Sequence, residues 1–341
     1  MAKCLRVERE NAEAERKKLC AAGLLDNSCV PARGRKYVYF PIKEGGRPPA
    51  GAKLVQKKLE RRGERPKSLR EALSGKLTPQ EMEGLVTSFD LVGDIAVVEV
   101  PPALAAKEKL IAAAIMAAHH NVQVVAKKTG GTAGEFRIRP VEVIAGEKRT
   151  SALYREGGCS FELDLNKTYF SPRLGTERGR LCTLVKKGER VLVPFAGVGP
   201  FAIRIARAVP SAQVVGIELN PDACAFFRKN VERNRCANVT VEEGDAGKMM
   251  RGKYAGWADR IAMPLPKDAV QFLPDAICAL KRGGMLHYYS FGSMDAPFAQ
   301  AEKDVLDAAG KAGRKARIAF RRVVRPYSKN TEQVAVDAEI L

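Results

Sequence analysis

Two glycines and one glutamate form the clearest ligand-binding pattern in this sequence. An apolar run at 191–195 leads into Gly197 and Gly199, an apolar helical pattern follows, and Glu218 ends the next apolar run. Glycines let a backbone approach a ligand closely, and a carboxylate about twenty residues further on accepts hydrogen bonds from ribose hydroxyls. The pattern therefore predicts the first half of a doubly wound α/β sheet that binds a nucleoside.

The identity of the nucleoside follows from a missing glycine. The dinucleotide pattern G-x-G-x-x-G has Ala202 in place of its third glycine, which favours S-adenosylmethionine over NAD. Asp245 ends a third apolar run, so it is a candidate for the adenine amino group, the alternative being an ordinary loop carboxylate. We expect the cofactor to contact Phe195, Gly197, Val198, Gly199, Pro200, Glu218, Leu219, Asp245, Ala246 and Pro264.

Metal and imidazole chemistry find little support in the sequence. The eight cysteines are scattered without a C-x-x-C pair or a nearby histidine set of the kind that a zinc site needs. The chain has only three histidines, so we expect a carboxylate rather than an imidazole as a general base. We expect reduced thiols and no metal.

The remaining apolar runs predict the rest of the carboxy-terminal sheet. A fourth strand ends in Pro264-Leu265-Pro266, and because proline cannot donate to a ladder, we expect this turn at the rim of the active site. Strands over 285–291, 316–328 and 332–340 complete seven strands that end in a hairpin. This arrangement is typical of an α/β class I S-adenosylmethionine-dependent methyltransferase.

The length and the net charge of the chain predict its domain number and the kind of partner that it binds. The chain has 341 residues, which is long for one core and predicts several domains. Its 58 Lys and Arg against 39 Asp and Glu give a formal net charge of +19, which favours a polyanionic partner, the alternative being a solvated basic surface. The longest apolar stretch, 110–118, is too short to span a bilayer, and no signal peptide begins the chain, so we expect a cytoplasmic protein without a membrane partner.

Two smaller α+β domains are expected before the methyltransferase domain. Strand-like segments at 4–7 and 38–42 flank a charged helical segment, and a Gly/Pro-rich, basic stretch follows. Ser68 and Thr78 each begin a capping-box pattern. The expected divisions are a small domain at 1–45, a basic linker at 46–77, a middle α/β domain at 78–158 and the methyltransferase domain at 159–341.

The middle domain contains a basic, Gly-rich loop at 129–140, between a strand over 122–128 and a strand over 141–146. Such a loop faces phosphates in some proteins. The commoner alternative is a solvated hairpin, and the sequence leaves both open for Lys127, Lys128, Arg137 and Arg139.

Blocks of sequence along nearly the whole chain resemble the archaeal and eukaryotic tRNA (guanine-N1)-methyltransferase family, which modifies position 37, and its relatives in wyosine synthesis. The resemblance lies in SFDLVGDIAVVEVP at 88–101, GEFRIRPVEVIAG at 134–146, FELDLNKTYFSPRLGTERGR at 161–180, PFAGVGPFAI at 194–203, GIELNPDA at 216–223, MPLPK at 263–267, GGMLHYYSF at 283–291 and VRPYS at 324–328.

The resemblance implies roles for the target-side residues. Glu177 would take the proton from guanine N1, Tyr169 and Arg173 would help to position the base, and Arg137 would stabilise negative charge on the guanine oxygen, with Arg139 as a neighbouring candidate. The family also implies a mobile amino-terminal domain that checks the tRNA elbow. We expect tRNA as the partner of a monomer that needs no protein partner.

Two departures from the family pattern leave alternatives open. Pro264 stands where many members have an asparagine that contacts the base, and Pro194 stands where an acid is frequent. The alternatives to guanine methylation are therefore a wyosine-pathway enzyme on the same scaffold, either a 4-demethylwyosine methyltransferase or an aminocarboxypropyl transferase, and a catalytically weak tRNA-binding protein.

Overall fold

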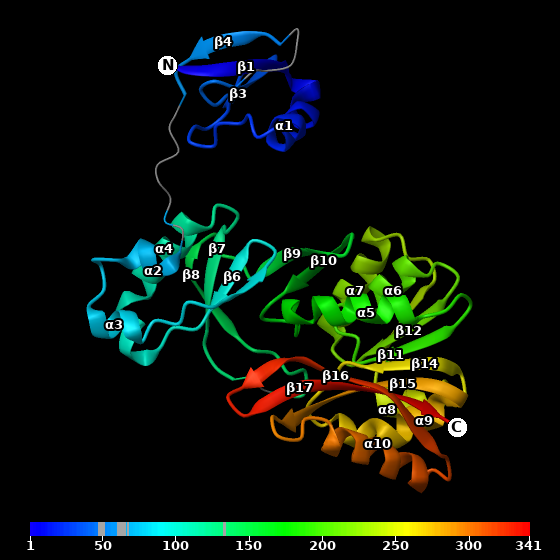
Figure 1. The fold of residues 1–341 in the computed structure, drawn as a ribbon. Coiled ribbons are helices and arrows are strands. Elements are labelled where there is room, and N and C mark those ends of the chain that lie inside the picture. Colours follow the sequence, from blue (N-terminus) through cyan, green and yellow to red (C-terminus); the bar gives the residue numbers. More distant parts are fainter. Residues whose placement is uncertain (47–51, 60–65, 67, 132–133) are drawn as a thin grey trace. The chain divides into compact units, whose positions relative to one another are not determined.

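The computed structural model describes residues 1–46, 52–59, 66, 68–131 and 134–341. These residues form two compact units, Met1–Ser74 and Gly75–Leu341 (Figure 1). Residues 47–51, 60–65 and 67 of the predicted linker, and residues 132–133 of the predicted Gly-rich loop, lie outside the described residues.

The first unit contains a four-stranded sheet in the order β2-β3-β1-β4. Alternate residues of β1, Leu5 and Val7, are buried with Leu19 of the helix, as the two-residue period of a strand requires. The elements of this unit are β1 (Ala2–Glu8), η1 (Arg9–Asn11), α1 (Ala12–Ala21), β2 (Ala32–Arg33), β3 (Tyr37–Pro41), β4 (Leu54–Lys57) and α2 (Leu69–Leu73).

The predicted linker over 46–77 differs from the structure in its middle. Residues 54–57 form β4, which pairs antiparallel with β1. β4 is short and lacks an apolar run, so the sequence did not indicate a strand. The pairing satisfies backbone groups that would otherwise remain on the free edge of β1.

The second unit begins with one capped helical turn and a four-stranded sheet in the order β5-β6-β7-β8. Thr78 and Glu81 exchange both hydrogen bonds of the predicted capping box. β6 and β7 are parallel, and α4 connects them. The elements are α3 (Pro79–Glu83), β5 (Asp90–Val92), β6 (Ile95–Val98), η2 (Pro102–Lys107), α4 (Glu108–Ala118), β7 (Val124–Lys128) and β8 (Val141–Gly146).

A β-hairpin of β9 (Ser151–Glu156) and β10 (Cys159–Asp164) follows this sheet. The expected boundary between residues 158 and 159 falls at its turn, where Gly157 and Gly158 have φ angles of 55° and 76°. Such left-handed angles are typical of two-residue hairpin turns. The domain boundaries themselves stay predictions.

The seven-stranded sheet has the order β13-β12-β11-β14-β15-β17-β16, as the sequence predicted a seven-stranded arrangement. The first five strands in this order are parallel to one another, and β17 is antiparallel to both of its neighbours. The elements are η3 (Pro172–Leu174), α5 (Gly175–Leu184), β11 (Arg190–Pro194), α6 (Pro200–Ala208), β12 (Gln213–Glu218), α7 (Pro221–Arg233), β13 (Val239–Glu243), α8 (Ala246–Arg251), β14 (Ala258–Met263), η4 (Ala269–Phe272), α9 (Leu273–Ala279), β15 (Leu280–Ser293), α10 (Ala299–Lys311), β16 (Ala316–Ser328) and β17 (Thr331–Ile340).

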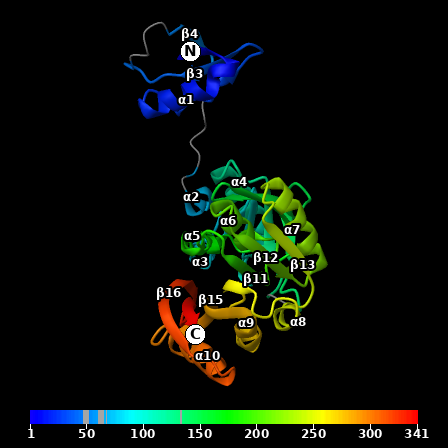
Figure 2. The ribbon, with the colours of Figure 1, turned by 90° about the vertical axis from the view of Figure 1, so that its right-hand side faces the viewer.

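Helices cover both faces of this sheet (Figure 2). Val191 and Val193 of β11 pack with α5, α6 and α7, whereas Leu192 packs with α8, α9 and α10. Because both faces are buried, the central strands read as continuous apolar runs, which made them easy to predict. In the sheet, β11 lies between β12 and β14, so the strands that follow it are added first on one side and then on the other, and ligands bind at such switch points.

Candidate active site

A cavity of about 900 Å³ opens at the carboxyl ends of β11, β12 and β13. The seven-stranded sheet supplies one side of it, and the four-stranded sheet with the loop after β7 supplies the other. Seven of the ten predicted cofactor residues line it: Phe195, Gly197, Glu218, Leu219, Asp245, Ala246 and Pro264. The other three lie behind the cavity wall.

Val198, Gly199 and Pro200 shape the glycine loop. Val198 is fully buried, and Pro200 is the first residue of α6. Gly199 has φ +87°, and a Cβ at this position would lie 2.1 Å from the Phe227 ring. Only glycine fits this turn, which sets where the loop turns into α6.

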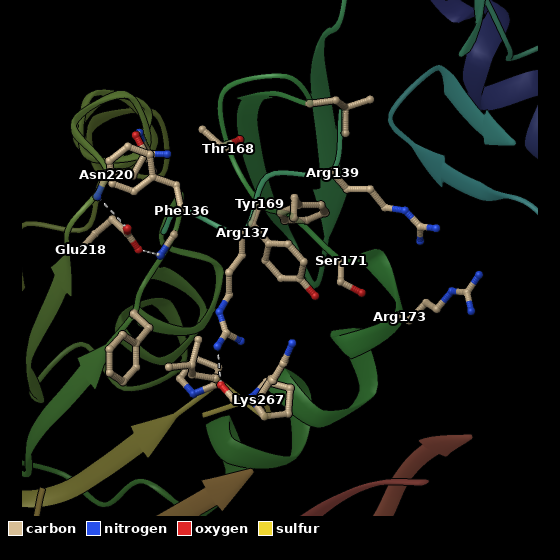
Figure 3. Close-up of a pocket in the computed structure, with 18 of the residues that line it drawn as sticks. Phe136, Arg137, Arg139, Thr168, Tyr169, Ser171, Arg173, Glu218, Asn220 and Lys267 are labelled. Atoms are coloured by element: carbon tan, nitrogen blue, oxygen red, sulfur yellow. Dashed lines mark hydrogen bonds between the residues drawn. The ribbon is translucent and has the colours of Figure 1, made fainter. Parts of the chain in front are cut away.

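Glu218 is held at the end of β12 by three backbone amides. Its Oε2 accepts from Gly197 N at 2.7 Å, and its Oε1 accepts from Leu219 N at 3.0 Å and Asn220 N at 2.9 Å (Figure 3). Burial raises the pKa of this carboxyl, and the three amide hydrogen bonds oppose that rise. Glu218 is therefore a rigid acceptor at the cavity wall.

Asp245 occupies the corresponding place after β13. Its side chain caps α8 by accepting from Lys248 N at 2.9 Å, and it lines the cavity together with Ala246. One carboxylate oxygen makes this cap, which leaves the second available to a ligand donor.

Three of the predicted target-side residues, Arg137, Tyr169 and Arg173, line the same cavity. Arg137 Nη2 donates to Lys267 O at 2.5 Å and to Asp268 Oδ2 at 2.7 Å, and its side chain points toward Lys267 (Figure 3). Arg173 Nε donates to an acid of β5, Asp90, at 2.6 Å. The structure thus brings these residues of separate sequence blocks together.

Glu177 lies elsewhere. It is 1% exposed and is not among the residues that line the cavity. Both of its oxygens accept from Arg180, at 2.6 to 3.0 Å, and Oε1 also accepts from Tyr289 Oη at 2.7 Å. The carboxylate that the resemblance implies as the base is therefore engaged inside the protein in this structure.

This ion pair belongs to a larger buried network. Arg180 also donates to Asp337, whose Oδ1 lies 2.6 Å from His287 Nδ1. Arg260 lies 2.7 Å from His287 Nε2, and since arginine can only donate, Nε2 accepts and Nδ1 carries the proton. Complete burial lowers the pKa of His287, so the imidazole is neutral in the folded protein.

Several cavity residues escaped the sequence analysis as site residues. Lys128 and Arg139 belong to the basic loop region that the sequence left open, and the carboxylates near them come from other elements. Arg325 and Tyr327 lie in the VRPYS block, which contributed to the family resemblance but did not mark either residue as part of a site. The residues concerned are Asp90, Glu99, Lys128, Glu135, Lys267, Phe272, Arg325 and Tyr327, whereas Arg139 was already a candidate beside Arg137.

Two comparisons of sequence identify relatives over almost the whole chain. A family model described as the TRM5/TYW2 methyltransferase domain matches residues 152–318, a TYW2 N-terminal domain matches 69–150, and a tRNA methyltransferase 5 N-terminal domain matches 4–47. The tRNA (guanine(37)-N(1))-methyltransferase Trm5b of Pyrococcus abyssi is 36% identical, over 100% of this chain and 99% of its own length. This chain belongs to the TRM5/TYW2 methyltransferase family.

Other members of the TRM5/TYW2 family extend the comparison. Trm5b of Methanocaldococcus jannaschii is 30% identical, over 99% of this chain and 98% of its own. The crystal structure of wild-type Trm5b from P. abyssi superposes with a TM-score of 0.73 over 100% of this chain and 99% of that one. A structure described as the complex of aTrm5 and tRNALeu has a TM-score of 0.72 and 28% identity, covering 99% of each chain.

Neither a candidate metal site nor a candidate membrane-spanning helix occurs among the described residues of this chain. No group of three or more His, Cys, Asp or Glu side chains in it could hold a metal ion. None of its helices has the length and apolar character that crossing a bilayer requires.

Proposed function

We propose that this protein is a tRNA (guanine(37)-N1)-methyltransferase, which transfers a methyl group from S-adenosylmethionine to the guanosine 3′ of the anticodon. One observation carries the proposal: a single cavity joins the nucleoside-binding ends of β11, β12 and β13 to Arg137 and Tyr169. Relatives that cover nearly the whole chain bear this name. Methyl transfer needs donor and acceptor in one enclosed space.

The residues around Glu218 fit the nucleoside part of S-adenosylmethionine. A carboxylate has about four acceptor positions, and three amides occupy three of them, so one position remains for a ribose hydroxyl. Gly197 gives the ligand close access to the backbone, and the second oxygen of Asp245 can accept from the adenine amino group. When bound, the cofactor supplies the electrophilic methyl group.

In the reaction, guanine N1 forms a bond to the methyl carbon, the sulfur–methyl bond breaks, and S-adenosylhomocysteine leaves. The N1 proton must pass to a base, because neutral guanine is a poor nucleophile at N1. Both hydrogen bonds of Arg137 use Nη2, so Nη1 and Nε remain to donate to the guanine oxygen as negative charge develops there.

Glu177 stays our proposed proton acceptor, on the resemblance, and its geometry sets a condition. The carboxylate must exchange its bonds to Arg180 and Tyr289 and reach the cavity when RNA binds. Glu177 lies in the first turn of α5, directly after the segment of Tyr169 and Arg173, so a shift of this segment on RNA binding would move all three together.

The predicted domain at residues 1–45 is proposed to contact the tRNA away from the reacting base, since a tRNA methyltransferase 5 N-terminal domain matches 4–47. We further propose a cytoplasmic monomer that binds one tRNA. The mass of the free protein and of its tRNA complex, measured by light scattering, tests the stoichiometry.

The direct test is methyl transfer from labelled S-adenosylmethionine to an unmodified tRNA transcript with guanosine at position 37, followed by mass analysis of the nucleosides. N1-methylguanosine is expected, and changing that guanosine to adenosine should abolish it. Cofactor binding without any methylated guanosine would overturn the proposal.

A second candidate is methylation of 4-demethylwyosine at the same position. Two observations favour it: Pro264 in place of the family asparagine, and a 33% identical relative from Saccharolobus solfataricus named tRNA 4-demethylwyosine(37)-methyltransferase Taw21. That relative aligns with 62% of this chain. The same assay with tRNA that carries 4-demethylwyosine distinguishes the two substrates.

A further inference from the structure

Three cationic side chains gather along one rim of the cavity. Lys128 ends β7, Arg139 lies near the end of the Gly-rich loop, and Arg173 lies in η3, and all three line the cavity. Arg139 and Arg173 extend to the same side of the cavity, away from Glu218 (Figure 3). Arg139 and Arg173 therefore occupy the part of the rim opposite the nucleoside-binding wall.

Two carboxylates, Glu99 and Asp90, lie near the three cations, so the cluster keeps a net positive charge. Glu99 Oε2 lies 3.8 Å from Lys128 Nζ and 4.0 Å from Arg139 Nη2, and both distances are too long for hydrogen bonds. Asp90 accepts one hydrogen bond, from Arg173 Nε. Three positive charges thus face two negative ones, and most of the N–H groups of this cluster point to no carboxylate.

Lys128 is the least satisfied member. Its side chain is only 14% exposed, and within the described part of the chain its ammonium makes no hydrogen bond. Burial lowers the pKa of Lys128, and the nearby Arg139 and Arg173 lower it further. A largely enclosed ammonium without a hydrogen-bond acceptor costs free energy, which an anion between these three groups would offset.

We propose that Lys128, Arg139 and Arg173 form a subsite for one phosphate of the RNA backbone next to the target nucleoside. The inference rests on the proposed function. A base that enters the cavity carries its sugar and phosphate to the rim, where two guanidinium forks and one ammonium match phosphate oxygens. The subsite anchors the nucleotide while Arg137 contacts the base.

The test combines protein variants with RNA that lacks one charge. Lys128→Ala and Lys128→Gln are compared with Lys187→Ala, which changes an exposed lysine outside the cavity-lining residues. Each full-length protein is titrated with tRNA at several salt concentrations, and with tRNA that has an uncharged methylphosphonate at either phosphate flanking residue 37. Cofactor affinity and melting temperature report whether each variant folds.

We expect both Lys128 variants to bind tRNA roughly tenfold more weakly, with a salt slope smaller by about 0.7 to 0.9, the amount for one phosphate contact. One methylphosphonate should weaken wild-type binding by a similar factor and have a smaller effect on the variants, in which only Arg139 and Arg173 still face the phosphate. Lys187→Ala should behave as wild type.

Three outcomes would overturn the subsite. These are unchanged affinity and salt slope in a folded Lys128 variant, equal methylphosphonate effects in wild type and variant, and a loss equal to that of Lys187→Ala. Because the readout is binding, the subsite is tested even if no methyl transfer occurs. A phosphate contact without N1-methylguanosine would retain the subsite and overturn only the proposed reaction.

Discussion

Arg137 and Asp268 contact each other while both have left-handed backbones. Arg137 Nη2 lies 2.7 Å from Asp268 Oδ2, and their φ angles are 53° and 66°. Such angles cost a non-glycine residue on the order of 1 kcal/mol and cluster at functional sites. Phe195 of the cavity wall has φ 58° as well. The contact ties the loop before β8 to the loop after β14, and so orients the guanidinium that faces the substrate.

Replacing Asp268 with Asn should reduce activity without reducing stability. The ion pair is largely open to solvent, with side-chain exposures of 25% and 55%, so its loss should cost less than about 1 kcal/mol. The orientation of Arg137 should suffer, however, and kcat should fall roughly tenfold, whereas Arg137→Ala should lower kcat by about 10² to 10³. Single-turnover methyl transfer and thermal unfolding measure the two effects. An Asp268→Asn enzyme with wild-type kcat would show that Arg137 needs no such support.

Replacing Glu177 with Gln tests the proposed base. Loss of proton removal should lower kcat by about 10² to 10⁴ while tRNA and cofactor affinities stay within twofold of wild type. Tyr289→Phe is the matched variant, because it removes a donor to Glu177 and keeps the carboxylate. If Glu177 is the base, this variant should retain most of the wild-type kcat. Equal losses in both variants would instead assign Glu177 a positioning role.

The glycine loop should tolerate no side chain at Gly199. In Gly199→Ala the new Cβ would lie 2.1 Å from the Phe227 ring at φ +87°, so the loop must shift, at a cost of about 1 to 3 kcal/mol. Cofactor affinity should fall together with stability. Gly310→Ala in α10 is the control: its Cβ meets no atom within 4 Å, and alanine should stabilise the helix by about 0.5 to 1 kcal/mol. Calorimetry and denaturant unfolding compare the two variants.

The nucleoside-binding motif and the seven-stranded sheet could be predicted from the sequence because their signals come from residues that are close together in the chain. The turn at Gly197, the acid at Glu218 and the apolar strands lie within a few tens of residues, and each has its own pattern, so the seven-stranded fold was predicted correctly. The sequence patterns did not predict β9, β10 or α10. β9 and β10 are six-residue strands of mixed polarity, and α10 lies outside the blocks that carry the family resemblance.

Contacts between residues that are far apart in the chain could not be predicted from the sequence. Tyr289 lies 112 positions from Glu177, and Asp268 lies 131 positions from Arg137. Single residues of this kind give no periodic signal, since their partners are set by how strands and loops meet in three dimensions. The engagement of Glu177 inside the protein, away from the cavity, was therefore visible only in the structure.

The buried pair of His287 and Asp337 should make the folded protein sensitive to acid. Hydrogen bonds from His287 and Arg180 lower the pKa of Asp337 from 3.8 to about 2 in spite of burial, so its contribution to stability is present above pH 3.8 and is lost as the pH falls toward 2. That contribution is about 2 kcal/mol. Burial lowers the pKa of His287 in the folded protein. As the pH falls below about 6.5, His287 is therefore protonated in the unfolded chain before it is protonated in the folded one, and the stability begins to decrease.

Urea unfolding between pH 8 and pH 2 should therefore show two successive losses of stability. Asp337→Asn should destabilise the protein by about 2 to 3 kcal/mol at pH 7, because Arg180 and His287 lose their charged acceptor while Arg180 keeps its ion pair with Glu177, and should remove the loss below pH 4. Glu339→Gln is the control on the same strand: its partner Arg317 is 68% exposed, so less than about 1 kcal/mol should be lost. If the two variants had the same acid profile, the decline would have to come from other carboxylates, and the His287–Asp337 pair would carry no special share of the stability.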